Sequence, residues 1–159
     1  MVNEAMFSSA SEEWETPKWL FDELDNEFHF NLDPCASRGN AKCERYFTKE
    51  DDGLTQDWEG IVFVNSPYGR AIGNWVRKAY TSAAVARTAT VVCLIPARTD
   101  TRWWWEFVSK GEVRFIKGRL KFGGGKHSAP FPSAIVIFRR GDVRPKTIYW
   151  TAHEQRKTG

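Results

Sequence analysis

The sequence has few cysteines and no paired metal-ligand spacing. Its three cysteines, Cys35, Cys43 and Cys93, form no Cys-x-x-Cys pair. An odd number without paired spacing argues against a disulfide framework and favours a reducing compartment. The three histidines are scattered along the chain, so the ligand spacing of a zinc site is missing and we expect no bound metal.

Long apolar runs are also missing. No stretch approaches the ~20 consecutive apolar residues that a transmembrane helix needs. The segment from Met1 to Ser11 has neither the basic region nor the apolar region of a secretory signal peptide. We therefore expect a soluble protein that stays inside the cell, without a membrane partner.

The composition is that of one globular domain. The 159 residues are 42% hydrophobic and 27% charged, and no Pro/Gly/Ser-rich linker or repeat divides them. We expect a single domain over 1–159, with its core at about 14–150 and a disordered tail at 151–159. The net charge is only +3. Basic residues gather at 98–119 and 139–157, which fits either a nucleic-acid-binding face or an ordinary solvated surface.

Hydrophobic periodicity predicts an α/β sheet with helices between its strands. Thr16 and Pro17 have the pattern of a helix N-cap followed by proline at the first helical position. The predicted helices are Pro17–Glu27, Ile72–Ala86 and Trp103–Ser109. The predicted strands are Phe28–Leu32, Arg45–Phe47, Ile61–Val64, Thr90–Ile95, Glu112–Ile116, Arg119–Phe122 and Ser133–Phe138. In such sheets ligands bind beyond the carboxyl ends of parallel strands, where the loops after Leu32, Val64 and Ile95 would converge.

The loop Asn65-Ser66-Pro67-Tyr68 follows a buried strand and carries the chemistry of an amine site. Pro67 favours an extended Ser66, so that the Asn65 side-chain oxygen and the Ser66 carbonyl become two nearby acceptors. Tyr68 adds a flat aromatic face. This set suits a planar ring that bears an exocyclic NH2 group, since both protons would be held while the ring stacks. Taken alone, the same four residues are also typical of a plain turn.

Other motifs make the interpretation more specific. Three segments resemble motifs of the amino-methyltransferases. The first, Glu15-Thr16-Pro17, resembles their N-terminal cofactor motif, and the second, Asp33-Pro34-Cys35-Ala36, resembles their Asp-Pro-Phe-Ala-Gly-Ser-Gly loop. The third, Asn65 to Tyr68, resembles their catalytic (Asp/Asn/Ser)-Pro-Pro-(Tyr/Phe) motif. Together with 96–101 and 129–134, these segments are similar to the phage Dam-type DNA N-6-adenine methyltransferase family, over about 14–138. The sequence departs from the family pattern at Ser66, which replaces a proline, and in having only Gly39 where a glycine-rich turn is expected.

The resemblance implies a compact Rossmann-like sheet with helices on both faces, closed by a C-terminal antiparallel hairpin. It also implies S-adenosylmethionine as methyl donor, with S-adenosylhomocysteine as product. Thr16 and Pro17 would contact the methionine end of this cofactor, beside Glu15. Asp33 and the following loop would hold its amino and carboxylate groups. An acid between this loop and Asn65 would bind the ribose hydroxyls of the cofactor, and the candidates are Asp51 and Asp52. Asp57 would approach the cofactor adenine.

The implied reaction is methylation of adenine N6 in DNA after base flipping. Asn65, Ser66 and Pro67 would hold the amino group, and Tyr68 would stack on the base together with Phe122 or Phe131. Candidate DNA contacts are Arg70, Arg98, Asp100 and Arg119, with recognition loops at 98–105 and 123–130. The protein would act as a monomer or homodimer, in the cytoplasm of a bacterial host if a phage or prophage encodes it. Protection of DNA from restriction is a role that this leaves open.

Rival hypotheses remain at this point. Ser66-Pro67-Tyr68 also resembles the motif of cytosine-N4 methyltransferases. An RNA base or a protein glutamine presents a comparable sp2 amino group, and a non-catalytic DNA-binding protein would need no cofactor.

Overall fold

The computed structural model describes residues 14–122, 127–141 and 144–151. Residues 152–159 of the predicted tail at 151–159 lie outside these ranges, as does the glycine-rich part of the second recognition loop, at 123–126. Within them, no helix is long and apolar enough to cross a membrane.

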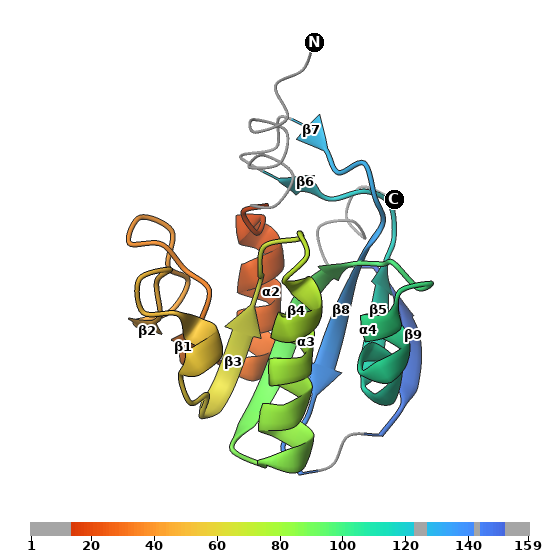
Figure 1. Cartoon of the computed structure of the whole chain (residues 1–159). Coiled ribbons are helices and arrows are strands. Elements are labelled where there is room, and N and C mark those ends of the chain that lie inside the picture. The colour runs from red at the N-terminus through yellow and green to blue at the C-terminus, as the bar shows by residue number, and fades with distance from the viewer. Residues whose placement is uncertain (1–13, 123–126, 142–143, 152–159) are drawn as a thin grey trace.

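A seven-stranded sheet forms the centre of the molecule, in the order β2-β1-β3-β4-β8-β5-β9 (Figure 1). Every strand runs parallel to the others except β8, which is antiparallel to both of its neighbours. The strands are β1 (Leu32–Asp33), β2 (Arg45–Tyr46), β3 (Gly60–Val64), β4 (Ala89–Pro96), β5 (Glu112–Ile116), β8 (Ser133–Phe138) and β9 (Lys146–Trp150). A separate antiparallel pair, β6 (Lys121–Phe122) and β7 (His127–Ser128), lies beyond the carboxyl ends of β3 and β4 (Figure 1).

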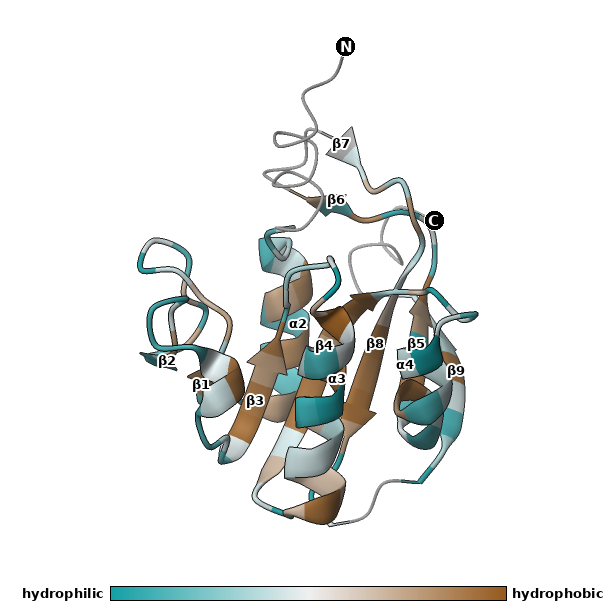
Figure 2. Ribbon diagram, viewed as in Figure 1, coloured by the Kyte–Doolittle hydropathy of each residue, from teal (hydrophilic) through white to brown (hydrophobic). Residues whose placement is uncertain are grey.

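Helices cover both faces of the sheet. Helix α2 (Lys18–Phe28) packs on one face, and α3 (Ile72–Tyr80) and α4 (Arg102–Glu106) pack on the other. Successive side chains of a strand point to opposite faces. Val62 and Val64 therefore join the α3 core, whereas Phe63 joins the α2 core. The central strands are mostly apolar, as the brown of β3, β4 and β8 in Figure 2 shows. This is the α/β fold with a C-terminal antiparallel hairpin that the sequence predicts.

The termini of α2 differ from the prediction. The helix begins at Lys18, with Pro17 as its N-cap and no side-chain capping bond. Thr16 is therefore not the cap, because its hydroxyl accepts a hydrogen bond from Asn65 instead. At the other end the helix includes Phe28, and His29 terminates it with a φ of 59°. The following strand is consequently shorter than predicted and starts only at Leu32.

Several other elements depart from the prediction. Helix α3 ends at Tyr80 and continues as a π-helical turn, η2 (Thr81–Val85). The predicted strand from Arg119 begins only at Lys121, because Gly118 makes a turn with a φ of 74°. Helix α4 is followed by a 3-10 turn, η3 (Val108–Lys110), rather than continuing to Ser109. A further 3-10 turn, η1 (Gly53–Thr55), and strand β9 were not predicted.

Candidate active site at the carboxyl ends of β1 and β3

A cavity of about 790 Å³ opens at the carboxyl ends of β1 and β3. Its wall comes from the segment before α2, the loops that follow β1 and β3, the stretch around 48–53 and one residue of α3. The lining residues are Trp14, Glu15, Thr16, Asp33, Pro34, Cys35, Ala36, Ser37, Arg38, Asn40, Lys42, Thr48, Lys49, Glu50, Asp52, Gly53, Phe63, Asn65, Ser66, Pro67 and Trp75. The size suits a ligand of several hundred daltons.

Asp33 organises the loop after β1. Its carboxylate accepts hydrogen bonds from the backbone N–H groups of Cys35 (3.2 Å) and Lys42 (3.0 Å). These two bonds draw both ends of the loop toward one side chain, which is 5% exposed and lines the cavity. Burial raises the pKa of the Asp33 carboxyl, although the two N–H groups and the Lys42 charge lower it. A buried carboxylate in this position would be stabilised by a cationic ligand group.

The close approach that a glycine permits in this loop occurs at Gly53, not at Gly39. A Cβ atom at Gly53 would lie 2.0 Å from the Pro34 carbonyl oxygen, whereas one at Gly39 would meet nothing within 4 Å. The Trp58 indole N–H donates to the Gly53 carbonyl at 2.9 Å and holds it from the other side. Gly53 therefore packs the 48–55 stretch directly against the Asp33-Pro34-Cys35-Ala36 motif.

Asn65 is held by the segment before α2. Its side-chain nitrogen donates to the Trp14 carbonyl and, at 2.9 Å, to the Thr16 hydroxyl oxygen. Two acceptors on the nitrogen side fix the orientation of the amide, because a flipped amide would place its oxygen against the Trp14 carbonyl. Asn65 Oδ1 is buried and has no hydrogen-bond partner in the described part of the chain. Asn65 lines the cavity, so this buried, unsatisfied acceptor belongs to the cavity wall.

The rest of the catalytic motif is only partly open to the cavity. Ser66 and Pro67 line it, but Tyr68 does not. The Tyr68 side chain is 3% exposed, and its hydroxyl donates to the Leu94 carbonyl at 3.4 Å. Burial raises the pKa of this phenol, so it stays protonated. Its ring meets Phe131 edge-on, with centroids 5.5 Å apart.

Aromatic side chains from distant segments meet beside this motif. Trp14 contacts both Phe122 and Phe131 edge-on, each at 5.3 Å between ring centroids. Phe122 belongs to β6, and Phe131 precedes β8. The two predicted base-stacking phenylalanines are thus brought together with Tyr68, although Phe122 is buried.

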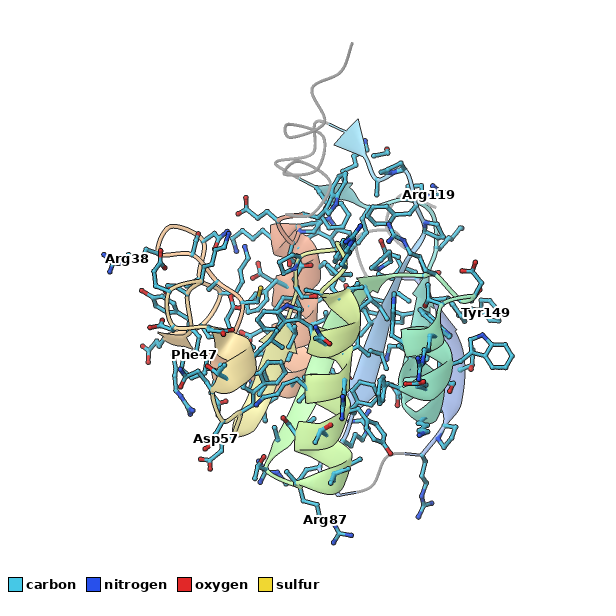
Figure 3. The ribbon with its side chains drawn as sticks, in the orientation of Figure 1. Arg38, Phe47, Asp57, Arg87, Arg119 and Tyr149 are labelled. Carbon is cyan, nitrogen blue, oxygen red and sulfur yellow. The ribbon has the colours of Figure 1, made fainter. Side chains whose placement is uncertain are left out.

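Most of the predicted cofactor residues lie around the cavity. Those that line it are Glu15, Thr16, Asp33, Pro34, Cys35, Ala36 and Asp52. Pro17 and Asp51 are not among the lining residues, and the Asp51 carboxylate accepts from the Thr48 backbone N–H and hydroxyl. Asp57 is exposed and precedes β3, so it lies near the amino end of that strand, away from the cavity (Figure 3).

The predicted DNA contacts Arg70, Arg98, Asp100 and Arg119 are all on the surface, and none of them lines the cavity. The loop after β4, which we expected to share the cavity with those after β1 and β3, also lies outside it. Of the three consecutive tryptophans, Trp104 is buried and Trp105 is 72% exposed.

Several residues that line the cavity were not predicted from the sequence. Lys42 lines the cavity, and its ammonium is 3.8 Å from the Glu15 carboxylate. Trp75 comes from α3 and stacks on Trp58 with centroids 6.0 Å apart. Glu50 lines the cavity where Asp51 was expected. A basic residue nine positions after Asp33 was a usable signal, whereas Trp75 looks like any other core residue of an amphipathic helix.

The donor set fits S-adenosylmethionine. Glu15 and Asp33 supply carboxylates for an ammonium group, Lys42 supplies a cation for a carboxylate, and Pro34 and Trp75 supply apolar surface. By contrast, no cluster of three or more His, Cys, Asp or Glu side chains in the described ranges could hold a metal ion. The arrangement is thus that of a site for a zwitterionic organic ligand beside an amide acceptor.

Comparisons with known proteins place the chain in a family. Residues 5–157 match the model of the family described as DNA N-6-adenine-methyltransferase (Dam). A DNA N-6-adenine-methyltransferase of Haemophilus phage HP1 (strain HP1c1) is 33% identical, across 92% of this chain and 90% of that protein. Another, from Escherichia phage T1, is 29% identical across 58% of this chain and 39% of that protein.

The fold has a counterpart among solved structures. A modification subunit of a putative type I restriction enzyme from Vibrio vulnificus YJ016 superposes with a TM-score of 0.50 over 93% of this chain, at 12% identity. The chain spans about half (49%) of the length of that subunit. The family match and the similarity over nearly the full length of a phage protein confirm the predicted family: the chain belongs to the DNA N-6-adenine-methyltransferase (Dam) family.

Proposed function

We propose that this protein transfers a methyl group from S-adenosylmethionine to the N6 amino group of adenine in DNA. Membership of the family supports this reaction. One observation at the site, an unsatisfied side-chain oxygen, supports the assignment of the amino-group acceptor to Asn65. Asn65 Oδ1 is one of two buried side-chain atoms in the described ranges without a hydrogen-bond partner, the other being Ser133 Oγ. A buried acceptor without a donor is costly, and a substrate amino group would remove that cost.

The amino group of adenine is a weak nucleophile because its lone pair is delocalised into the ring. Asn65 Oδ1 and the Ser66 carbonyl would each accept one of its protons, which favours a tetrahedral nitrogen with an exposed lone pair. This is activation by positioning and by fixed dipoles, and it needs no strong general base. As the new N–C bond forms, the bond between the sulfonium sulfur and the methyl carbon would break, and S-adenosylhomocysteine would leave with its electron pair. The extra proton on the nitrogen would then pass to water.

The cavity would hold the cofactor beside this acceptor. S-adenosylmethionine supplies an electrophilic methyl group on a sulfonium centre. Glu15 and Asp33 would hold its ammonium group and Lys42 its carboxylate. Asp52 and Glu50 are the acids that line the cavity and could bind ribose hydroxyls, while Asp51 and Asp57 lie outside it.

The target base would leave the duplex to reach Asn65, since the N6 group is not accessible in the stack. Tyr68 would stack on the base from one side, which requires Phe131 to move off its ring. Arg70, Arg98 and Arg119 are surface cations that would contact phosphates, which positions DNA without reading its sequence. We further propose that the protein works in the cytoplasm of a bacterial host, as a monomer or homodimer.

The test is to identify the methylated product. Purified protein is incubated with labelled S-adenosylmethionine and, in parallel, unmethylated duplex DNA, RNA or a glutamine-containing peptide, followed by nucleoside or amino-acid analysis. We expect label in N6-methyladenine from DNA alone. Label in N4-methylcytosine, RNA or peptide, or none at all, would contradict the proposed substrate.

A further inference from the structure

We propose that the segment Trp14–Thr16 is a positioning element for Asn65, and that it makes catalysis depend on an amide, rather than a carboxylate, at position 65. The proposal rests on the proposed function, because it concerns how the acceptor for the target amino group is oriented. It predicts that a carboxylate, which other members of the resembled motif carry at this position, cannot simply replace the amide in this chain.

The Trp14 carbonyl fixes the orientation of the Asn65 amide. A carbonyl oxygen can only accept, so the group that contacts it must donate a proton. Asn65 Nδ2 supplies that proton and also donates to Thr16 Oγ1 at 2.9 Å. The two bonds consume both N–H groups of the amide and leave Oδ1 as a buried acceptor without a partner in the described ranges.

A carboxylate at position 65 could not make the same contact with the Trp14 carbonyl. The ionised side chain of an Asn65→Asp variant would put a negative oxygen against the Trp14 carbonyl, where no proton is available. Two facing acceptors repel, and because the contact is part-buried beside Thr16, which is 4% exposed, water screens the repulsion only in part. The ionised carboxylate would rotate away from the Trp14 carbonyl, so the acceptor geometry would be lost at neutral pH.

The segment Trp14–Thr16 also forms part of the cofactor cavity. Trp14, Glu15 and Thr16 all line it, and the Glu15 carboxylate lies 3.8 Å from the ammonium of Lys42, another lining residue. One short stretch of chain therefore forms part of the cofactor wall and also holds the acceptor for the substrate. The Thr16 hydroxyl acts through Asn65, which makes it a positioning residue.

Asn65→Asp tests the amide requirement, with Asn74→Asp on the exposed surface of α3 as the matched control. Single-turnover methyl transfer to DNA is measured at saturating cofactor from pH 5.5 to 8.5. At pH 7.5 we expect Asn65→Asp to be slower by about 100-fold, comparable to the loss of one preorganised hydrogen-bond partner elsewhere. The control should match the wild type. A rate for Asn65→Asp within about threefold of wild type at pH 7.5 would overturn the proposal.

The pH dependence of the methyl-transfer rate shows whether Asn65→Asp loses the orientation of its acceptor oxygen or is simply damaged in its fold. Once protonated, the carboxyl group of the Asn65→Asp variant could donate its O–H to Trp14 and keep the other oxygen as acceptor, so the variant-to-wild-type rate ratio should rise as the pH falls. The ratio cancels the titration of the other ionisable groups that line the cavity, which are Glu15, Asp33, Cys35, Arg38, Lys42, Lys49, Glu50 and Asp52. A ratio that stays flat would contradict the requirement for a donor.

Thr16 supplies a second test in case Asn65→Asp does not fold. Thr16→Val keeps the side-chain shape but removes the acceptor, whereas Thr16→Ser retains it. We expect kcat to fall about tenfold in Thr16→Val, which corresponds to one lost hydrogen bond, and to stay within about threefold of wild type in Thr16→Ser. Equal rates in the two variants would refute the role of Thr16. A wild-type protein that does not methylate adenine would instead refute the proposed function itself.

Discussion

Replacing Gly53 with alanine tests whether the packing behind the cofactor cavity sets its affinity. The new Cβ atom would lie 2.0 Å from the Pro34 carbonyl oxygen and 3.2 Å from the Trp75 ring. Because an ordinary C···O contact is about 3.3 Å, Pro34 and Gly53 must separate by roughly 1.3 Å. Overpacking of this kind costs about 1–3 kcal/mol of the free energy of unfolding.

The same displacement acts on the cofactor site, since Pro34 and Gly53 both line it. If about 1.4 kcal/mol of the strain is relieved by moving Pro34, cofactor affinity falls roughly tenfold. Titration calorimetry with S-adenosylmethionine gives the affinity, and urea unfolding gives the stability.

Gly73→Ala is the matched control, because its Cβ meets Trp103 at an ordinary 3.5 Å inside helix α3. An alanine there should leave affinity unchanged and can stabilise the helix by up to ~1 kcal/mol. If Gly53→Ala keeps both wild-type stability and wild-type affinity, the close contact with Pro34 is not what shapes the cavity.

Three further predictions concern stability, pH and accessibility. Arg114→Met removes bonds to Glu27 and leaves the buried Glu112 with only Arg139 as its charged partner in the described ranges. Urea unfolding should show a loss of about 3 kcal/mol. Burial alone would raise the pKa of Glu112, but its bonds to Arg139 and Arg114 lower it. A carboxyl with a lowered folded-state pKa stabilises the fold above its unfolded pKa, ~4.3. That stability should disappear as the pH falls further, and Glu112→Gln should flatten this acid limb. Saturating cofactor should protect the cavity-lining Cys35 from iodoacetamide at pH 8, and equal labelling with and without cofactor would contradict the assigned site.

The sequence was most informative where a strand is apolar along its whole length. Strand β8 has the bounds that were predicted, because a central strand of a sheet is buried on both faces and leaves a nearly continuous apolar run. Strand β5 also has its predicted bounds, although it carries Glu112 and Arg114. Strand β9 was missed for the opposite reason. It is a half-exposed edge strand, with Tyr149 88% exposed, and only its parallel pairing with β5 defines it.

The candidate site was predictable as far as local motifs reach. The loops that begin at Asp33 and Asn65 both line the cavity, because the carboxyl ends of parallel strands share one edge of the sheet. Thr16 was misassigned as a cap because its partner, Asn65, is 49 residues away in sequence. Gly53 acts where Gly39 was expected, since the packing partner Pro34 is set by the fold and not by the loop motif.

The most direct test of the account is methyl transfer by Asn65→Ala, compared with Asn74→Ala as the control. Both variants are first shown to bind S-adenosylmethionine, and single-turnover formation of N6-methyladenine in duplex DNA is then measured. We predict that Asn65→Ala keeps cofactor affinity within a few-fold but loses transfer by about 100-fold or more, while Asn74→Ala matches the wild type. Normal methylation by Asn65→Ala would contradict the central claim that the buried Asn65 oxygen holds the target amino group.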